Sequence, residues 1–204
     1  MKQFLLILAL ICAAQVLAAQ SAYSPRYDAL RENKENAIAS DRLNRLFALR
    51  WEQVMVENPE YATEVGYPGQ NDRWSDASLE TIQKQKTGPV EAQKVLQSIK
   101  RNKLSATEQL NYDLFKYNLE RDIVGNRFPT ELMPVNQMSG VQQEIASILA
   151  ESPAGSVKDF ENMIARLNGV PTLVDQNIER LMCCEDRGTF AELTSAFVQG
   201  SVPP

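Results

Sequence analysis

Apolar side chains recur every three or four residues along most of the chain, and this spacing constrains the fold more than any other feature of the sequence. From residue 40 to residue 182, successive segments gather their large apolar side chains on one face of a helix. No segment alternates apolar and polar residues over a length that would predict a strand. The sequence therefore predicts an all-α fold, an irregular bundle of several helices.

The segment 105–125 carries the strongest local helix signals. Ser105 and Glu108 have the spacing of a capping box, in which each side chain accepts from the backbone N–H of the other residue. Gly125 is well placed to end the helix. Apolar residues mark two of its faces, which is typical of a helix at the centre of a bundle. The first face carries Leu110, Leu114 and Tyr117, and the second carries Tyr112, Phe115, Leu119 and Ile123.

Glycine and proline divide the other helical segments. Asn58 and Pro59 end a helix that begins near Ser40, because the residue before proline avoids helical geometry. Gly88 and Pro89 predict either a kink or a break. In the last helix, which begins near Ser156, we expect Gly169 to break or bend the chain and Pro171 to restart it. The apolar residues expected to face inward there are Phe160, Met163, Ile164 and Leu167, followed by Val170, Leu173, Val174, Ile178 and Leu181.

Residues 1–18 have the pattern of a secretory signal peptide. Lys2 precedes an apolar run from Phe4 to Ala14, and small residues follow up to a cleavage position after Ala18. The run is short for a membrane span, although a short N-terminal anchor is the alternative interpretation. We predict an exported protein, periplasmic or extracellular, with no stable membrane insertion after cleavage. The polar residues 19–39 are expected to form a poorly ordered lead-in.

Composition excludes several kinds of chemistry. The chain has no histidine, so the usual zinc ligand sets and the Ser-His-Asp and Cys-His arrangements cannot be assembled. The net charge is −5 and no basic run is present, so we predict no nucleic-acid partner.

The adjacent Cys183 and Cys184 form either a strained disulfide or two ordinary thiols. Carboxylates are plentiful, but no pair stands out, and we assign no catalytic residue and no metal ligand.

Two loops hold the candidate substrate-binding residues. Arg73, in the loop "GYPGQNDRWSD", is suited to binding a carboxylate through two hydrogen bonds, or else it ties the loop to nearby helix ends. Asn136 and Gln137, in the loop "RFPTELMPVNQMSG", each offer a donor and an acceptor for a peptide backbone. Alternatively, both amides bond to the backbone of their own loop. Composition alone does not decide between these interpretations.

Four stretches of the chain, in order, resemble the N-terminal part of the bacterial family called domain of unknown function 885. These stretches are residues 50–79, 104–120, 127–145 and 156–181, and the resemblance covers roughly residues 43–181. Its most specific parts are the turn "NPEYA", the helical "NYDL" and the loop "MPVNQM". The resemblance thus includes both loops that hold the candidate residues.

The resemblance implies a largely helical protein of the secreted or lipid-anchored zinc-peptidase type. Such chains continue well beyond this length, and their metal site, a histidine–glutamate helix motif with further ligands, lies in the later half. Because this chain has no histidine, no residue receives those roles. The resemblance therefore implies the N-terminal helical portion of a larger fold, with zinc and a peptide substrate only in the complete protein. Residues 183–204 are expected to be a divergent or truncated tail.

Two functional hypotheses follow. The first is an exported N-terminal fragment of a metallopeptidase-like protein of unknown substrate, without the zinc site and inactive alone. The alternative is a complete noncatalytic helical module that binds a partner in the periplasm. A third hypothesis, an independent hydrolase with two carboxylates, rests only on the abundance of Asp and Glu.

Overall fold

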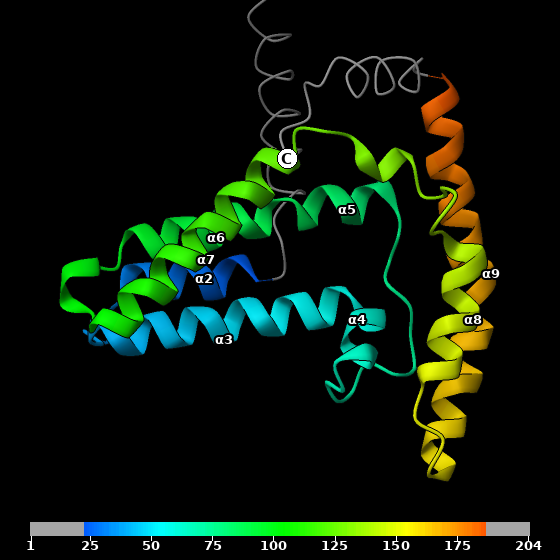
Figure 1. The fold of residues 1–204 in the computed structure, drawn as a ribbon, viewed down its shortest axis with the longest axis horizontal. Helices are drawn as coiled ribbons and strands as arrows, with labels where there is room; N and C mark the ends of the chain where they lie inside the picture. Colours follow the sequence, from blue (N-terminus) through cyan, green and yellow to red (C-terminus); the bar gives the residue numbers. More distant parts are fainter. Residues whose placement is uncertain (1–22, 187–204) are drawn as a thin grey trace, which may run out of the picture. The chain divides into compact units, whose positions relative to one another are not determined.

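The computed structural model describes residues 23–186, which form helices joined by loops (Figure 1). The all-α prediction is confirmed, since these residues contain no strand. The predicted signal peptide and the chain beyond residue 186 lie outside the described residues. The α-helices are α2 (Ser24–Glu32), α3 (Ala39–Glu57), α4 (Pro59–Glu64), α5 (Leu79–Gln85), α6 (Thr87–Gln97), α7 (Ala106–Gly125), α8 (Val141–Glu151) and α9 (Val157–Asp186). Two short 3-10 helices are η1 (Arg101–Lys103) and η2 (Thr130–Leu132).

The chain divides into two compact units that alternate along the sequence. Unit 1 contains the described residues up to Val54 and the segment Gln83–Phe128. Unit 2 contains Met55–Ile82 and the described residues from Pro129 onward. Helical periodicity does not show which helices pack together, so the prediction of one helical portion over residues 40–182 did not address this division. The structure shows an apolar core in each unit.

Unit 1 is built around one apolar core. Its aromatic residues include Phe47 and Phe115, whose rings meet edge to face with centroids 4.9 Å apart. Removal of this apolar surface from water is the main force that holds these helices together. The buried members are Tyr27, Leu43, Leu46, Leu49, Ala92, Val95, Leu96, Ile99, Leu104, Tyr112 and Leu119.

Helix α2 differs from the poorly ordered lead-in that we expected over residues 19–39. Pro25 lies in its first turn, where a missing N–H costs nothing. Tyr27 is only 2% exposed, and its hydroxyl donates to Gln53 Oε1 at 2.6 Å. One buried aromatic side chain therefore anchors a segment whose composition is otherwise polar, and composition gave no sign of it.

Arg42, on α3, joins two helix ends within unit 1. Its guanidinium donates to the carbonyl oxygens of Leu30 at 2.9 Å and Ser98 at 3.1 Å, and to Ser98 Oγ at 2.6 Å. These carbonyls lie at the C-terminal ends of α2 and α6, where the carbonyl oxygens of the last turn have no N–H donors within the helix. Burial lowers the pKa of Arg42. A single buried cation thus connects three helices.

The predicted ends of helix α7 are confirmed, but its predicted position at the centre of the bundle is not. The capping box forms, with Ser105 N–H donating to Glu108 Oε2 at 2.8 Å, and the helix ends at Gly125. Tyr112 and Leu119 are buried on one face. The other face is exposed, so the expectation of a central helix is wrong. The exposed apolar residues of α7 are Leu110, Leu114, Tyr117 and Val124.

The sequence at Gly88 and Pro89 breaks the helix just before Gly88. Helix α5 ends at Gln85 and α6 begins at Thr87. A Cβ atom added at Gly88 would lie 2.7 Å from Gln53 Nε2, which is closer than packed atoms approach. Glycine therefore lets the start of α6 approach α3 within unit 1.

The long helix of unit 2 runs through the positions where we expected a break. Helix α9 extends from Val157 to Asp186 with Pro171 inside it, so neither Gly169 nor Pro171 ends it. Its start is as predicted, with Ser156 N–H donating to Asp159 Oδ2 at 2.9 Å. The apolar core of this unit is small, and its buried members are Trp74, Ala77, Ile148 and Leu173.

Candidate functional site

Arg166 is the centre of unit 2. It lies on α9, its side chain is fully buried, and its guanidinium donates to groups from three other segments. These segments are α4, the loop that follows it, and the C-terminal end of α8. One side chain thereby holds both loop and helices against α9. The acceptors are Arg73 O at 3.1 Å, Ser152 Oγ at 3.2 Å, Pro59 O at 3.1 Å, Thr63 Oγ1 at 2.6 Å and Gln70 O at 3.1 Å.

Trp74 completes this arrangement. Its indole Nε1–H donates to the carbonyl oxygen of Arg166 at 2.7 Å. The Arg166 guanidinium carbon lies 5.4 Å from the centroid of the same ring, within the range of a cation–π interaction. A Cβ atom added at Gly169 would lie 3.0 Å from Trp74 Cδ1. Gly169 therefore makes room for the indole, and this packing gives glycine a role inside α9 that helix propensity does not reveal.

The charge of Arg166 is compensated by dipoles and not by an ion pair. Among the described contacts, Arg166 takes part in no salt bridge, and three of its acceptors are backbone carbonyls. Burial lowers the pKa of Arg166, and the charges of Glu60 and Asp72 oppose that change. An arginine stays protonated even so. Arg166 is therefore suited to positioning its neighbours and not to transferring a proton.

Arg73, the first candidate residue, is engaged with its own surroundings. Its Nη2 donates to the carbonyl oxygen of Val56, in the last turn of α3, at 2.8 Å. Its Nε donates to Gln70 Oε1 at 3.1 Å, and Nη2 bonds to the same oxygen. Because these contacts tie the loop to a helix end, the structure favours the interpretation in which Arg73 organises its loop. Its role in binding a carboxylate stays a prediction.

Asn136, the second candidate, bonds within its own loop. Its Oδ1 accepts from the backbone N–H groups of Met138 at 2.8 Å and Ser139 at 2.9 Å, and its Nδ2 donates to Ser139 Oγ at 2.8 Å. This turn fixes the backbone that carries Gln137. The Gln137 side chain is exposed and makes no hydrogen bond among those of the described residues. Of the two amides, Gln137 is the one that can meet a ligand.

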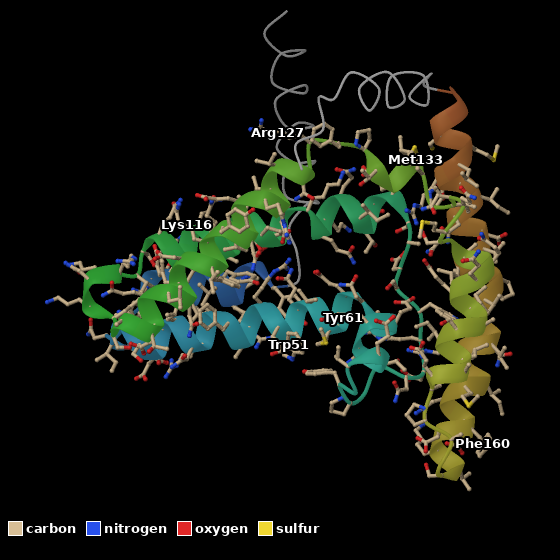
Figure 2. All side chains as sticks on the ribbon, in the orientation of Figure 1. Trp51, Tyr61, Lys116, Arg127, Met133 and Phe160 are labelled. Carbon is tan, nitrogen blue, oxygen red and sulfur yellow. The ribbon has the colours of Figure 1, made fainter. Side chains whose placement is uncertain are left out.

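The loop around Gln137 also exposes apolar side chains. Met133, Val135 and Met138 are exposed, with Met138 at 88%, and Figure 2 labels Met133 at the start of this loop. The 3-10 helix η2, which comes just before this loop, is tied to α9, because Arg180 Nε donates to the carbonyl oxygen of Glu131 at 2.6 Å. Burial lowers the pKa of Arg180, and the negative charges of Glu131 and Glu144 oppose that change. We call residues 133–139 the methionine loop, an exposed surface that combines flexible apolar side chains with a free amide.

The predicted core face of α9 is correct in part. Leu173 is buried as expected, but Phe160, Ile164 and Leu167 are 54%, 57% and 51% exposed, where we expected them to face inward. The inward face carries Arg166 and Asn177 beside Leu173, a third of a turn away from the three exposed residues. Because this face also carries polar side chains, a pattern based on apolar residues does not predict that it is buried. The signal that was missed is a cation at helical spacing from Met163, Val170 and Leu173.

A hollow lies in unit 1, next to α2 and α3. It encloses about 600 Å³. Its charged side chains pair with one another, as Arg26 does with Glu52 through a contact of 2.8 Å and Arg45 with Glu35 at 2.8 Å. None of the three candidate residues lines it. The hollow therefore adds no ligand-binding group to the candidate site.

Among residues 23–186, no group of three or more His, Cys, Asp or Glu side chains is arranged to hold a metal ion. The donor set of these residues thus does not fit a zinc site. No helix of the same part of the chain is both long enough and apolar enough to cross a membrane.

The family model described as bacterial protein of unknown function (DUF885) matches residues 59–196. The chain belongs to the DUF885 family. The match begins at the first residue of α4 and runs through α9, so it includes Arg166, its acceptors and all three candidate residues. It also includes residues 183–196, where we expected the chain to diverge. No curated protein and no solved structure matches the chain.

Proposed function

We propose that this chain is an exported helical scaffold that binds polypeptide, corresponding to the N-terminal portion of a zinc-peptidase-like DUF885 protein and inactive by itself. The observation that carries the proposal is exposed apolar surface on α9, in one patch from Val157 to Leu167 and another from Ile178 to Met182, which we call the stripe. The methionine loop follows η2, which is attached to the same helix through Arg180, and supplies a second contact surface. The chain belongs to the DUF885 family. Export, the relation to peptidases and the lack of activity are what we propose beyond that.

The stripe follows the geometry of a helix face. From Val157 to Leu167 its members recur at three- and four-residue spacing and so lie above one another along α9. Ile178 follows eleven residues after Leu167, which returns it to the same side of the helix. Figure 2 labels Phe160 among the side chains of this helix. Contiguous exposed apolar surface of this kind marks sites where another polypeptide packs. The exposed members are Val157, Phe160, Ile164, Leu167, Ile178, Leu181 and Met182.

The methionine loop is suited to a peptide of variable sequence. Methionine side chains adapt their shape to different apolar partners. Gln137 offers both a donor and an acceptor, as a peptide group does. The Asn136 turn fixes the loop backbone, so little order has to be gained on binding. These features support binding of peptide and supply no group for cleaving it.

The zinc chemistry of a peptidase, activation of water or polarisation of a carbonyl, has to come from residues other than those described here. No described cluster fits a zinc ion, and no histidine is present in the sequence. What this chain contributes is the placement of a polypeptide. Arg166 serves that purpose by fixing α4, its loop and α8 on α9.

Metal analysis of the purified chain, combined with a peptide-library digest, tests the lack of activity. We expect much less than one zinc ion per chain after dialysis, and no cleavage beyond a buffer control. A chelator such as EDTA should change neither result. Stoichiometric zinc with EDTA-sensitive hydrolysis of peptides would overturn the proposal.

Binding is tested with an unfolded polypeptide, reduced and carboxymethylated α-lactalbumin. Phe160→Glu with Ile164→Glu places two charges on the stripe, and we expect affinity to fall about tenfold or more. The matched control, Asn168→Glu with Thr172→Glu, adds the same charge to exposed polar positions of α9 and should bind nearly as the parent does. Equal loss in both variants would mean that charge alone weakens binding and that the stripe is not the contact surface.

Export is tested by expressing the chain from its first residue in a Gram-negative host. We expect the mature protein in the periplasmic fraction, with its N-terminus at Ala19 after cleavage behind Ala18. Retention of an uncleaved chain in the cytoplasm would contradict the export part of the proposal. That outcome would leave the binding test unaffected.

A further inference from the structure

We propose that Met133, Met138 and Met182 are sites of reversible oxidation, through which hypochlorous acid lowers the affinity of this chain for polypeptide. The regulation rests on the proposed polypeptide-binding function, because it acts on the two surfaces that would make the contact. Met133 and Met138 belong to the methionine loop, and Met182 belongs to the later patch of the stripe on α9. Which thioethers are oxidised can be measured without any ligand, so the two proposals are tested apart.

Exposure divides the methionines of residues 23–186 into distinct groups. Met138, Met182 and Met133 are 88%, 61% and 41% exposed. Met55, in contrast, is fully buried, and Met163 is partly buried. An oxidant dissolved in water attacks accessible sulfur atoms first. The exposed methionines therefore all lie on the proposed contact surfaces, and Met55 is an internal control for the selectivity of the reaction.

The turn at Asn136 holds the backbone of Met138 without using its side chain. Asn136 Oδ1 accepts from the N–H of Met138 at 2.8 Å and from the N–H of Ser139 at 2.9 Å. The N–H of Asn136 donates to the carbonyl oxygen of Ser139 at 2.9 Å. Because none of these bonds involves the thioether, a change at sulfur breaks none of them. Oxidation of Met138 therefore alters the contact surface and leaves the turn in place.

The reaction transfers one oxygen atom to sulfur. The thioether loses two electrons and forms a sulfur–oxygen bond, while the chlorine of hypochlorous acid is reduced to chloride and one proton is released. The product, methionine sulfoxide, is polar, whereas the thioether is apolar. Methionine sulfoxide reductases convert it back to the thioether. The chemistry therefore suits a reversible change of surface polarity.

A sulfoxide weakens a contact with apolar side chains. Burying its oxygen without a hydrogen-bond donor costs free energy. The adaptable apolar character that suits methionine to different partners is lost at the same time. With all three exposed methionines oxidised, we expect the affinity for reduced and carboxymethylated α-lactalbumin to fall about tenfold.

Peptide mass spectrometry tests which methionines react. The native cysteines are first replaced by serine, since thiols also react with the oxidant. Under increasing ratios of hypochlorous acid, we expect Met138 to be oxidised fastest, followed by Met182 and Met133, and Met55 about tenfold more slowly than Met138. Far-UV circular dichroism should show that the helices are kept. Oxidation of Met55 as fast as Met138, or loss of helix before the exposed sites have reacted, would overturn the proposal.

A binding measurement before and after oxidation tests the regulation. Met133→Leu with Met138→Leu and Met182→Leu keeps apolar side chains and removes the three oxidation sites. The matched control, Met163→Leu, removes a partly buried methionine outside the contact surfaces. The oxidant is quenched before the α-lactalbumin is added, and each protein is compared with its own affinity before oxidation.

We expect about a tenfold loss of affinity in the parent and in Met163→Leu, and less than about a twofold loss in the triple variant. Treatment with methionine sulfoxide reductases and dithiothreitol should restore the affinity of the oxidised parent. Equal losses in the parent and the triple variant would overturn the proposal, as would a loss that the reductases do not reverse.

The proposed function and its regulation give different results when they fail. A parent that binds no polypeptide before oxidation contradicts the proposed function, and with it the effect on affinity. A parent that binds polypeptide and keeps its affinity after the three methionines are oxidised contradicts the regulation alone.

Discussion

Each unit of this protein buries one arginine against backbone carbonyls, but the two units depend on that arginine to different degrees. In unit 1, Arg42 joins helix ends that already pack around a large apolar cluster. In unit 2 the described apolar cluster is small, and Arg166 bonds to α4, a long loop and α8. The difference indicates that a branched cation takes over the organising role where little apolar surface is buried. Unit 2 should therefore be the more sensitive to a single polar substitution.

The largest expected effect comes from Arg166→Ala. The substitution removes the guanidinium donor from the carbonyl oxygens of Gln70 and Arg73 and leaves Pro59 O with only its bond from Thr63 Oγ1 among the side-chain donors. We expect unit 2 to lose about 3–5 kcal/mol of stability. Urea unfolding followed through Trp74 fluorescence measures this in a Trp51→Phe background, because Trp51 and Trp74 are the two tryptophans of the chain. Arg166→Lys keeps the charge but can form fewer hydrogen bonds, so its stability should lie between those of the parent and Arg166→Ala. A loss below about 1 kcal/mol for Arg166→Ala would remove the distinction between the units.

Leu46→Ala addresses the apolar core of unit 1. Leu46 is fully buried, and its truncation should cost about 3 kcal/mol through lost burial and the cavity left behind. Hydrogen exchange resolved by peptide should show the loss in α2, α3, α6 and α7 and not in α9. If α9 loses protection to the same extent, the units unfold together and their separate treatment fails.

A smaller effect is expected where the indole of Trp74 meets α9. In the parent, Gly169→Ala gains helix propensity but crowds the Trp74 ring, so we expect no gain in stability. In a Trp74→Ala background the crowding is gone, and Gly169→Ala should stabilise the protein by up to about 1 kcal/mol. The four proteins form a double-mutant cycle, read by hydrogen exchange at α9, because the remaining tryptophan, Trp51, lies in unit 1. Additive effects would show that the contact is not responsible for the glycine.

The smallest predicted effect depends on pH. Burial raises the pKa of Asp76, but hydrogen bonds from Thr81, Ser78 and Gln176 outweigh it, so the pKa is lowered overall. A carboxyl with a lowered folded pKa adds stability above its unfolded pKa of about 4, and that stability disappears as pH falls through the folded value. Asp76→Asn should therefore lower the Tm by about 2 °C at pH 6, and this difference should shrink progressively as the pH falls below the unfolded pKa of about 4. A difference that persists in acid would assign the effect to lost geometry and not to charge.

Local signals in the sequence predicted the ends of helices well. Ser105 with Glu108 and Ser156 with Asp159 act through hydrogen bonds between residues three apart, so no distant partner is needed to form them. The same holds for the Asn136 turn, whose bonds stay within its loop. Fold class followed for the same reason, since helical periodicity is a local property.

Packing between distant segments could not be predicted in this way. Arg166 bonds to Pro59, 107 residues earlier in the sequence, and no pattern within α9 indicates that partner. We expected every apolar residue of the stripe to face inward, so Phe160 and Ile164 were predicted to be in the core and Arg166 was not. Helix α2 was missed for a similar reason, since Tyr27 is held by residues of α3 and α6. Of the candidate residues, only Gln137 has a side chain free for a ligand in the described structure.

The alternation of the two units along the chain has a consequence for synthesis. The last described residue assigned to unit 1 is Phe128, so this unit is complete while α8 and α9 are still to be made. Helix α4 and the loop after it emerge early, but their donor Arg166 follows only after about a hundred further residues. In a nascent chain halted between Phe128 and Arg166, we expect unit 1 to fold while α4 still lacks the hydrogen bonds from Arg166. The order of translation therefore favours folding of unit 1 first, and α9 then supplies the contacts that hold α4 and α8 in unit 2.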